Sequence, residues 1–194
     1  IIAGRNRLID SVIYNGLLNP ILRKVSESDS TLVSTALPAG QIIPAGGTGF
    51  TKAKIIAAAA KFRKNQVDDE ELFILYNSEM MTAILSDTTL TSADFMAVQM
   101  LQSGEISGKW LGFTWIHYEG PSGTYANGAG GATEARTVAY AKSGARFGEA
   151  TIVPIGINER YDLAHVHQIS SIESYGAGRT NELKVVAVEF LRAV

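Results

Sequence analysis

Apolar residues in the first half of the chain recur with the three-to-four-residue period of amphipathic helices. Residues 1–18 form the first such segment, which Asn-Gly at 15–16 and Asn-Pro at 19–20 are expected to break. Two more helices are predicted over residues 51–64 and from about 78 to 85. The predicted caps are Thr51 for the former and Asn77 or Ser78 for the latter.

The second half of the chain is rich in short apolar and alternating runs that are typical of strands. An earlier continuous apolar run at 72–76 predicts a buried strand, and the aromatic run at 110–118, with Gly112 inside it, predicts another. Further strands are predicted over residues 137–141, 147–157 (continuing the sheet), 161–174 and 183–192, with a turn at 175–181 and a long glycine-rich loop at 120–136. Helices that precede strands in this way indicate an α+β fold.

Residues 90–120 lie between these two halves of the chain. They predict a helix that begins after Thr91 or Ser92, then a turn, then the aromatic strand. No nucleophile, general base or metal ligand is arranged along this stretch. We therefore expect Trp110, Phe113 and Trp115 to pack in a core or against a neighbouring molecule, and not to bind a ligand.

The composition of the 194 residues excludes several classes of function. A formal net charge of -2 argues against a strong, sequence-independent grip on nucleic acid, which needs a basic face. The absence of cysteine excludes disulfides and cysteine-ligated zinc. No apolar run is long enough for a transmembrane helix, and no signal peptide is visible. Because the chain begins Ile-Ile without methionine, we expect a processed product, a truncated one or the ordered part of a longer protein.

Two glycine-rich segments are candidates for phosphate binding. Residues 46–52 precede a predicted helix, but Lys52 follows Thr51, whereas a phosphate loop ends in Gly-Lys-Ser/Thr. Residues 127–131 lack the spacing of a dinucleotide-binding turn. We interpret the first segment as a flexible entry to a helix and the second as a surface loop, and we expect no cofactor.

The histidines and carboxylates offer no defined catalytic or metal site. His165 and His167 share one face of a predicted strand and would need His117 to complete a zinc site, but nothing in the sequence brings His117 close. The carboxylates without a defined pair are Glu70, Glu71, Asp87, Asp94 and Glu105. No nucleophile-elbow motif accompanies the serines. We expect no catalytic, cofactor-binding or metal-ligating residue, and no enzyme.

The predicted helix at 51–64 is the most basic segment of the chain. Its cations are Lys52, Lys54, Lys61, Arg63 and Lys64. The three cations in its last turn complement the helix dipole. We interpret the stripe as a solvated face, and a modest contact with a polyanion is the alternative.

Four blocks of sequence, taken in order, resemble the major capsid proteins of tailed bacteriophages, which have the HK-ninety-seven-type shell fold. Residues 3–19 resemble the end of the long spine helix, residues 47–59 the first helix beyond it, and residues 72–87 the strand–helix pair that follows. Residues 90–116 carry the most telling pattern: Leu-Thr-Ser-x-Asp, then Ser-Gly-Glu-Ile, then Gly-Phe-x-Trp-Ile. The N-terminal arm, the extended loop and the start of the spine helix of these proteins have no counterpart in this sequence.

The resemblance implies a fold of two parts, an axial subdomain and part of a peripheral subdomain. Residues 1–41 would form the end of the spine helix and a linker in the peripheral subdomain, residues 42–150 the axial subdomain, and residues 151–194 the C-terminal strands that return to the peripheral subdomain. None of the motifs that carry the resemblance is catalytic.

The implied function is structural. Copies of the chain would assemble, in the host cytoplasm, into hexamers and pentamers of an icosahedral virion shell around double-stranded DNA that is held non-specifically. Scaffold, portal or decoration proteins are further expected partners, and no membrane is involved. The alternatives are a shell protein of an encapsulin-type bacterial compartment and a nucleotide- or metal-binding enzyme.

Overall fold

The fold was obtained as a computed structural model that describes residues 2–24, 26–28, 30–67, 69–86, 109–120, 133–163 and 165–192. In chain order the elements are α1 (Ile2–Leu18), β1 (Ile21–Lys24), β2 (Leu32–Thr35), η1 (Ala39–Gln41), β3 (Ile42–Ile43), α2 (Lys52–Lys64), β4 (Leu72–Tyr76), α3 (Ser78–Ser86), β5 (Lys109–Trp110), β6 (Phe113–His117), β7 (Glu134–Ala141), η3 (Lys142–Gly144), β8 (Ala145–Arg160), η4 (Tyr161–Leu163), β9 (Val166–Arg179), η5 (Glu182–Lys184) and β10 (Val185–Leu191). The mixture of helices and strands confirms the predicted α+β class.

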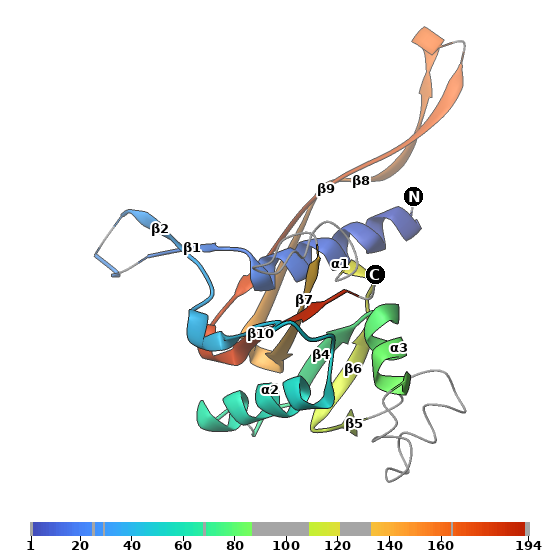
Figure 1. Cartoon of the computed structure of the whole chain (residues 1–194). Helices are drawn as coiled ribbons and strands as arrows, with labels where there is room; N and C mark the ends of the chain where they lie inside the picture. Colours follow the sequence, from blue (N-terminus) through green and yellow to red (C-terminus); the bar gives the residue numbers. More distant parts are fainter. Residues whose placement is uncertain are drawn as a thin grey trace.

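A six-stranded sheet with the order β3-β10-β7-β4-β6-β5 forms the centre of the molecule. β10 pairs parallel with β3 and antiparallel with β7, and β4 pairs antiparallel with β7 and parallel with β6. The last strand of the chain is therefore an inner strand, and it shares its sheet with strands from residues 42–141. Helix α1 lies on one face of this sheet, and α2 and α3 lie on the other (Figure 1).

The side-chain period of two along β10 supplies both faces of the sheet. Val186, Val188 and Phe190 belong to the core against α2 and α3, whereas Val185 and Ala187 belong to the core against α1. A strand that is apolar on both faces reads as an almost continuous hydrophobic run because neither face meets water. The predicted strand at 183–192 is thus confirmed over its central residues.

The three predicted helices are confirmed, with one correction. Helix α1 runs through Asn15 and Gly16 without a break and ends at Leu18. The Asn77 Oδ1 atom accepts a hydrogen bond from the Met80 N–H at 2.9 Å, so Asn77 caps α3 as expected. Thr51 occupies the extended cap position of α2 without a side-chain hydrogen bond.

The aromatic segment after residue 108 is two strands and not one. Leu111 and Gly112 both have positive φ angles, 52° and 88°, and form the two-residue turn between β5 and β6. The expectation of a core role is confirmed, since Trp110, Phe113 and Trp115 are all buried in the core against α2 and α3. The two tryptophan rings lie 5.4 Å apart. The helix predicted before this segment falls outside the described residues.

The strand boundaries between residues 120 and 181 also differ from the prediction. β7 begins at Glu134, so the glycine-rich loop does not extend to Arg136. Residues 145–179 do not continue the central sheet but form a separate hairpin, β8–β9, whose turn contains η4. Tyr175–Arg179, which we predicted to be in a turn, lies within β9. The start of β7 could not be predicted because the glycine-rich composition of residues 120–136 shows no alternation of apolar and polar positions.

Two hairpins project from opposite sides of the body, β1–β2 and the much longer β8–β9 (Figure 1).

Among the described residues, no helix combines the length and the apolarity that crossing a bilayer requires.

Candidate assembly surfaces

Helix α1 lies against the base of the β8–β9 hairpin, and Gly16 marks the closest approach. A Cβ atom on Gly16 would come within 2.5 Å of the carbonyl oxygen of Ala177 and 2.6 Å of its carbonyl carbon. Only glycine therefore lets the helix backbone pack this tightly against β9. The sequence signal, Asn-Gly, suggested a helix break, and the structure shows that the glycine is needed for packing.

Arg179 joins three segments at the base of the same hairpin. Its guanidinium donates hydrogen bonds to the carbonyl oxygens of Leu17 and Asn19, both at 2.7 Å, and to the Thr35 carbonyl oxygen at 3.2 Å. The Nε atom pairs with the Glu182 carboxylate at 2.8 Å, and the Arg179 side chain is fully buried. A single cation thus satisfies carbonyl groups at the end of α1 and at the end of β2.

Arg5 fastens the hairpin near the other end of α1. It pairs with Glu149 of β8 and, at 2.6 Å, with Glu173 of β9, and it donates a hydrogen bond to the Tyr175 hydroxyl at 2.7 Å. The hairpin is therefore held along α1 between Arg5 and Arg179. Sequence reasoning missed both arginines, because an isolated arginine in a helix or strand gives no local sign of its partners.

The hairpin changes register beyond this anchored part. Between Thr151 and Gly156, β8 advances five residues while β9 advances three, from Glu173 to Ser170, so β8 carries two extra residues. Such bulges bend a ribbon and increase its twist. The distal part, 156–170, projects away from the body after this bend (Figure 1).

The distal hairpin carries large apolar side chains with no cover from the described body. Ile157 and Ile169, which face each other across the two strands, are 70% and 53% exposed. Tyr161, Leu163 and Val166 at the tip are also exposed. Exposed apolar surface concentrated on a thin two-stranded projection indicates a contact with another protein surface, since such a ribbon is marginally stable alone.

Polar contacts shape the tip of this hairpin. His165 Nδ1 lies 2.6 Å from a Glu159 carboxylate oxygen, and the His165 ring stands edge-on to the Tyr161 ring at 5.2 Å. Arg160 pairs with Asp162, and these hydrogen bonds lower the pKa of the Asp162 carboxyl. His165 itself adopts a φ of 63°, a backbone conformation that residues other than glycine rarely adopt. The apolar tip is thus presented in one defined shape.

The β1–β2 hairpin is a second apolar projection. Its strands pair antiparallel from Ile21–Thr35 to Lys24–Leu32. Leu22, Leu32 and Val33 are all exposed on it. The molecule therefore has two apolar arms on opposite sides, and a contact between one arm and a different surface of another copy would be heterologous.

The three histidines do not come together. His117 lies on β6 in the body, where its Nε2 atom is 2.9 Å from Glu119 Oε1, whereas His165 and His167 lie at the distal end of β8–β9. In the described ranges, no group of three or more histidine, aspartate or glutamate side chains could hold a metal ion.

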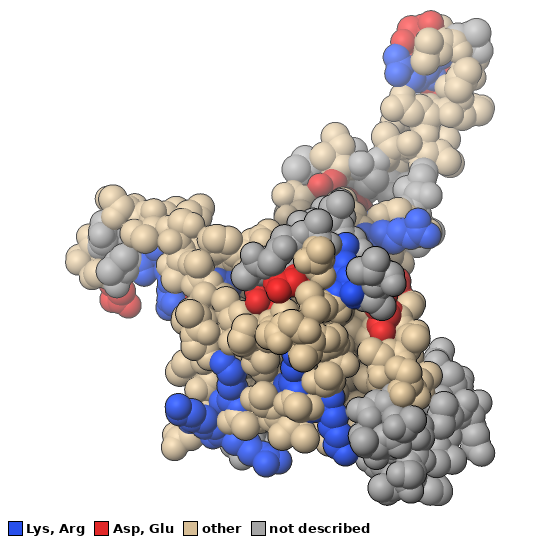
Figure 2. Space-filling view, in the orientation of Figure 1, with Lys and Arg blue, Asp and Glu red and all other residues tan. Residues whose placement is uncertain are grey.

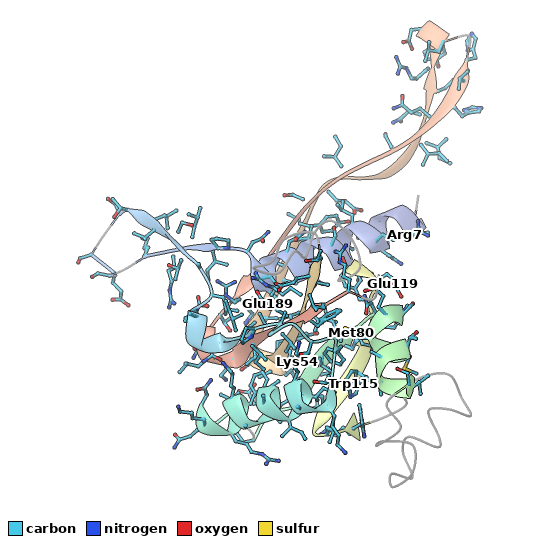
Figure 3. The ribbon with its side chains drawn as sticks, in the orientation of Figure 1. Arg7, Lys54, Met80, Trp115, Glu119 and Glu189 are labelled. Atoms are coloured by element: carbon cyan, nitrogen blue, oxygen red, sulfur yellow. The ribbon has the colours of Figure 1, made fainter. Side chains whose placement is uncertain are left out.

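The glycine-rich turn before α2 is built around Lys54. The Lys54 ammonium donates hydrogen bonds to the carbonyl oxygens of Ala45, Thr48 and Glu189, at 2.8, 2.9 and 2.9 Å (Figure 3). A phosphate cradle instead points N–H groups at its ligand. Lys54 is 7% exposed, and burial lowers its pKa. The prediction that Lys54 belongs to a solvated basic face is therefore wrong. The second glycine segment, 127–131, lies outside the described residues.

Of the carboxylates singled out from the sequence, Glu70 and Glu71 are described. Glu70 pairs with the Lys184 ammonium and accepts hydrogen bonds from the Ser143 hydroxyl at 2.8 Å and the Ser143 N–H at 3.1 Å. The hydrogen bond from Lys184 has the largest effect, and together with those from Ser143 it lowers the pKa of Glu70 to about 2. Glu71 makes an exposed pair with Lys142 at 3.3 Å. Asp87, Asp94 and Glu105 lie outside the described residues.

The Glu70 cluster predicts a pH dependence of stability. Because the folded-state pKa lies below the ordinary value of 4.5, the carboxylate stabilises the fold at pH above about 4.5, and this contribution is lost as pH falls toward 2. The Glu70→Gln variant should therefore be less stable than the parent at pH 6, and the gap should narrow between pH 4.5 and 2. Urea unfolding of the parent and the variant between pH 6 and pH 2 measures the difference in their free energies of unfolding. Glu71→Gln is the control, and an equal, pH-independent gap for both variants would contradict the assignment.

The solved structures that share this fold include phage capsids. The capsid of Ralstonia phage GP4 matches with a TM-score of 0.64 at 11% identity, over 98% of this chain and 65% of that chain. The Cyanophage Pam1 capsid asymmetric unit matches with a TM-score of 0.60 at 12% identity, over 99% and 66%. A structure from Mycobacterium phage Che8 matches with a TM-score of 0.51 at 20% identity, over 74% and 53%. The chain thus spans about half to two thirds of the length of these structures. No curated protein matches it.

The chain has the fold of a phage capsid shell protein, as these structures show. The sequence profile of the family described as Phage capsid protein matches residues 1–192, and the chain belongs to this family. This family and this fold are structural and not enzymatic. The resemblance that we inferred from four blocks of sequence is confirmed.

Proposed function

We propose that the chain forms most of a major capsid protein subunit that assembles, in the host cytoplasm, into hexamers and pentamers of an icosahedral shell around double-stranded DNA. The observation that carries this proposal is the pair of apolar arms on opposite sides of the body. Heterologous contacts close into rings when the rotation between copies permits it. Many modest contacts, repeated in a closed shell, then add up to a stable container.

In this proposal the central sheet, with α2 and α3, forms the axial subdomain. Helix α1 and the β8–β9 hairpin form the peripheral subdomain, because Gly16, Arg5 and Arg179 hold them together. We assign β10 to the axial subdomain, since it pairs with β7 and β3 in the sheet. The C-terminal segment 151–194 is thereby divided between the two subdomains.

Expression of the full-length protein tests the proposal directly. Electron microscopy should show closed shells of uniform diameter, built from six-fold and five-fold rings. A protein that remains monomeric, or stops at small oligomers, in the presence of its scaffold and packaging components would contradict it.

The distal hairpin should be needed for assembly but not for folding. Replacing Ile157 and Ile169 together with lysine removes the exposed apolar pair and places two charges in the proposed contact. We expect a subunit with an unchanged unfolding midpoint and at least a tenfold loss of assembled shells, measured by sedimentation and electron microscopy. The fold should be unaffected because both side chains are largely exposed in the subunit.

The neighbouring cross-strand pair offers a matched control. Asn158 and Gln168 face each other one register position further toward the tip, on the opposite face of the ribbon. The double lysine variant of this pair adds the same charge to the same arm. It should assemble better than the isoleucine variant, and equal loss in both would mean that charge alone, and not the apolar pair, sets the outcome.

A further inference from the structure

Helix α2 presents one exposed stripe along its whole length. The stripe consists of the partly exposed Lys52 and the exposed residues Ala53, Ile56, Ala60, Arg63 and Lys64. At 100° per residue these positions fall within about one third of the helix circumference. The opposite side is buried in the core through Ile55, Ala58 and Phe62. The stripe is about 18 Å long, at a rise of about 1.5 Å per residue.

The cations of this stripe have no carboxylate partner among the described residues. Elsewhere in the described chain, the lysines and arginines that pair with a carboxylate include Arg5, Arg23, Arg136, Lys142, Arg160, Arg179 and Lys184. On α2, Lys52, Arg63 and Lys64 form none, and the helix contains no acidic residue. In Figure 2 the blue side chains gather over α2, and the red side chains lie away from it.

Lys61, at the border of the stripe, shows that this positive charge is uncompensated. Its ammonium donates hydrogen bonds to the carbonyl oxygens of Gly40 and Ile42. Burial lowers the pKa of Lys61, and the nearby charge of Lys64 lowers it further. In the part of the chain that the structure describes, no carboxylate offsets this repulsion. An anion brought to the stripe would relieve it.

We propose that the α2 stripe faces the interior of the shell and contacts the phosphates of the packaged double-stranded DNA. This inference rests on the proposed function, because it names the surface through which the proposed shell contacts the DNA inside it. Ala53, Ile56 and Ala60 leave the middle of the stripe free of long side chains, so a rod-shaped polyanion can approach the helix closely. Lys52 lies at one end of the helix, and Arg63 and Lys64 lie at the other.

The contact is weak in each subunit and is repeated over the shell. The three cations of the stripe, two exposed and one partly exposed, neutralise at most about three phosphates. Each contact adds roughly 0.9 to the steepness with which log affinity falls against log salt. Binding of this kind carries no base specificity. It permits the DNA to slide during packaging and to leave again, which agrees with a net charge of only -2.

The absence of cysteine from the chain allows a direct test of orientation. In shells of the full-length Ala60→Cys variant, a small maleimide that passes the shell pores should label the cysteine. A maleimide carried on a protein too large for the pores should not label it until the shells are opened. Labelling of intact shells by the large reagent would place α2 outside and overturn the proposal. Labelling by neither reagent would place α2 between subunits and would overturn it too.

Charge substitutions test the contact itself. Capsomers from opened shells are titrated with double-stranded DNA at several salt concentrations. The variant Lys52→Gln, Arg63→Gln, Lys64→Gln should lower the salt slope by roughly 2–3. The control Arg7→Gln, Lys24→Gln removes two exposed cations outside α2 and should leave the slope nearly unchanged. Equal slopes for the α2 variant and the parent would overturn the DNA contact. A failure to form shells at all would instead count against the proposed function.

Discussion

Replacing Arg179 with methionine should lower the free energy of unfolding by about 3–5 kcal/mol, the range found when one partner of a buried ion pair is removed. The substitution leaves the carbonyl groups of Leu17, Asn19 and Thr35 without their donor. It also leaves the Glu182 carboxylate, only 13% exposed, without its buried partner. Methionine fills most of the volume of the arginine side chain. The lost free energy of unfolding therefore comes mainly from the missing polar contacts and less from a cavity. Urea unfolding, followed by tryptophan fluorescence and circular dichroism, measures the change.

Arg160→Met is the matched control for this prediction. Arg160 also pairs with a carboxylate, that of Asp162, but both side chains are exposed at the tip of the β8–β9 hairpin. Exposed pairs contribute about 0–1 kcal/mol, so this variant should unfold close to the parent. Similar losses for the two variants would mean that the Arg179 contacts do not hold α1, β2 and β9 together.

The second large effect is expected at Gly16. Replacing it with valine places the new side chain against the Ala177 backbone, where a Cβ atom would already lie 2.5 Å from the carbonyl oxygen. The helix must then move away from β9, and overpacking of this kind costs about 1–3 kcal/mol, occasionally more. Because the obstructing atoms belong to the backbone, the additional change Ala177→Gly should restore little of the loss. Unfolding midpoints of the single and double variants measure both effects.

Gly4→Ala provides the control on the same helix. Nothing lies within 4 Å of a Cβ atom at this position. Alanine is favoured over glycine in a helix by about 1 kcal/mol, so the substitution should stabilise the protein slightly. A destabilising Gly4→Ala would show that α1 tolerates no change, and the Gly16 result could then not be attributed to its contact with Ala177.

Both predictions concern how the long hairpin is held, and this links stability to assembly. Arg5, Gly16 and Arg179 fix the proximal part of β8–β9 against α1, and the bulges between Thr151 and Gly156 bend the ribbon beyond them. The apolar tip is therefore presented at a defined place relative to the central sheet. Weakening the base should reduce shell formation even where the tip is intact, because an arm that moves freely loses more entropy when it docks.

Several features of the fold were readable from the sequence because they depend on neighbouring residues alone. Helical periodicity predicted α1 and α2, and Asn77 marked the start of α3 through a hydrogen bond within four residues. The apolar run at 72–76 predicted β4, and the alternating run at 183–192 predicted β10. The block order also indicated the capsid family.

The sequence did not reveal which strands pair or which residues form the assembly surfaces. Local patterns describe β10 and β9 alike as strands, yet β10 is an inner strand of the sheet and β9 half of a projecting hairpin. The difference depends on contacts such as Arg5 with Glu173, 168 residues apart, and Arg179 with Leu17, 162 residues apart.

The sequence by itself therefore determined the class, the helices and the family of this protein, through short-range periodicity and block order. Only the tertiary structure decided that Gly16 is a packing contact, that Lys54 is buried and that two projecting arms carry exposed apolar residues. The physical reason is that burial and exposure are properties of the assembled layers. An isoleucine in an alternating run has the same sequence signature whether it faces a core or, as Ile157 does, projects from an arm.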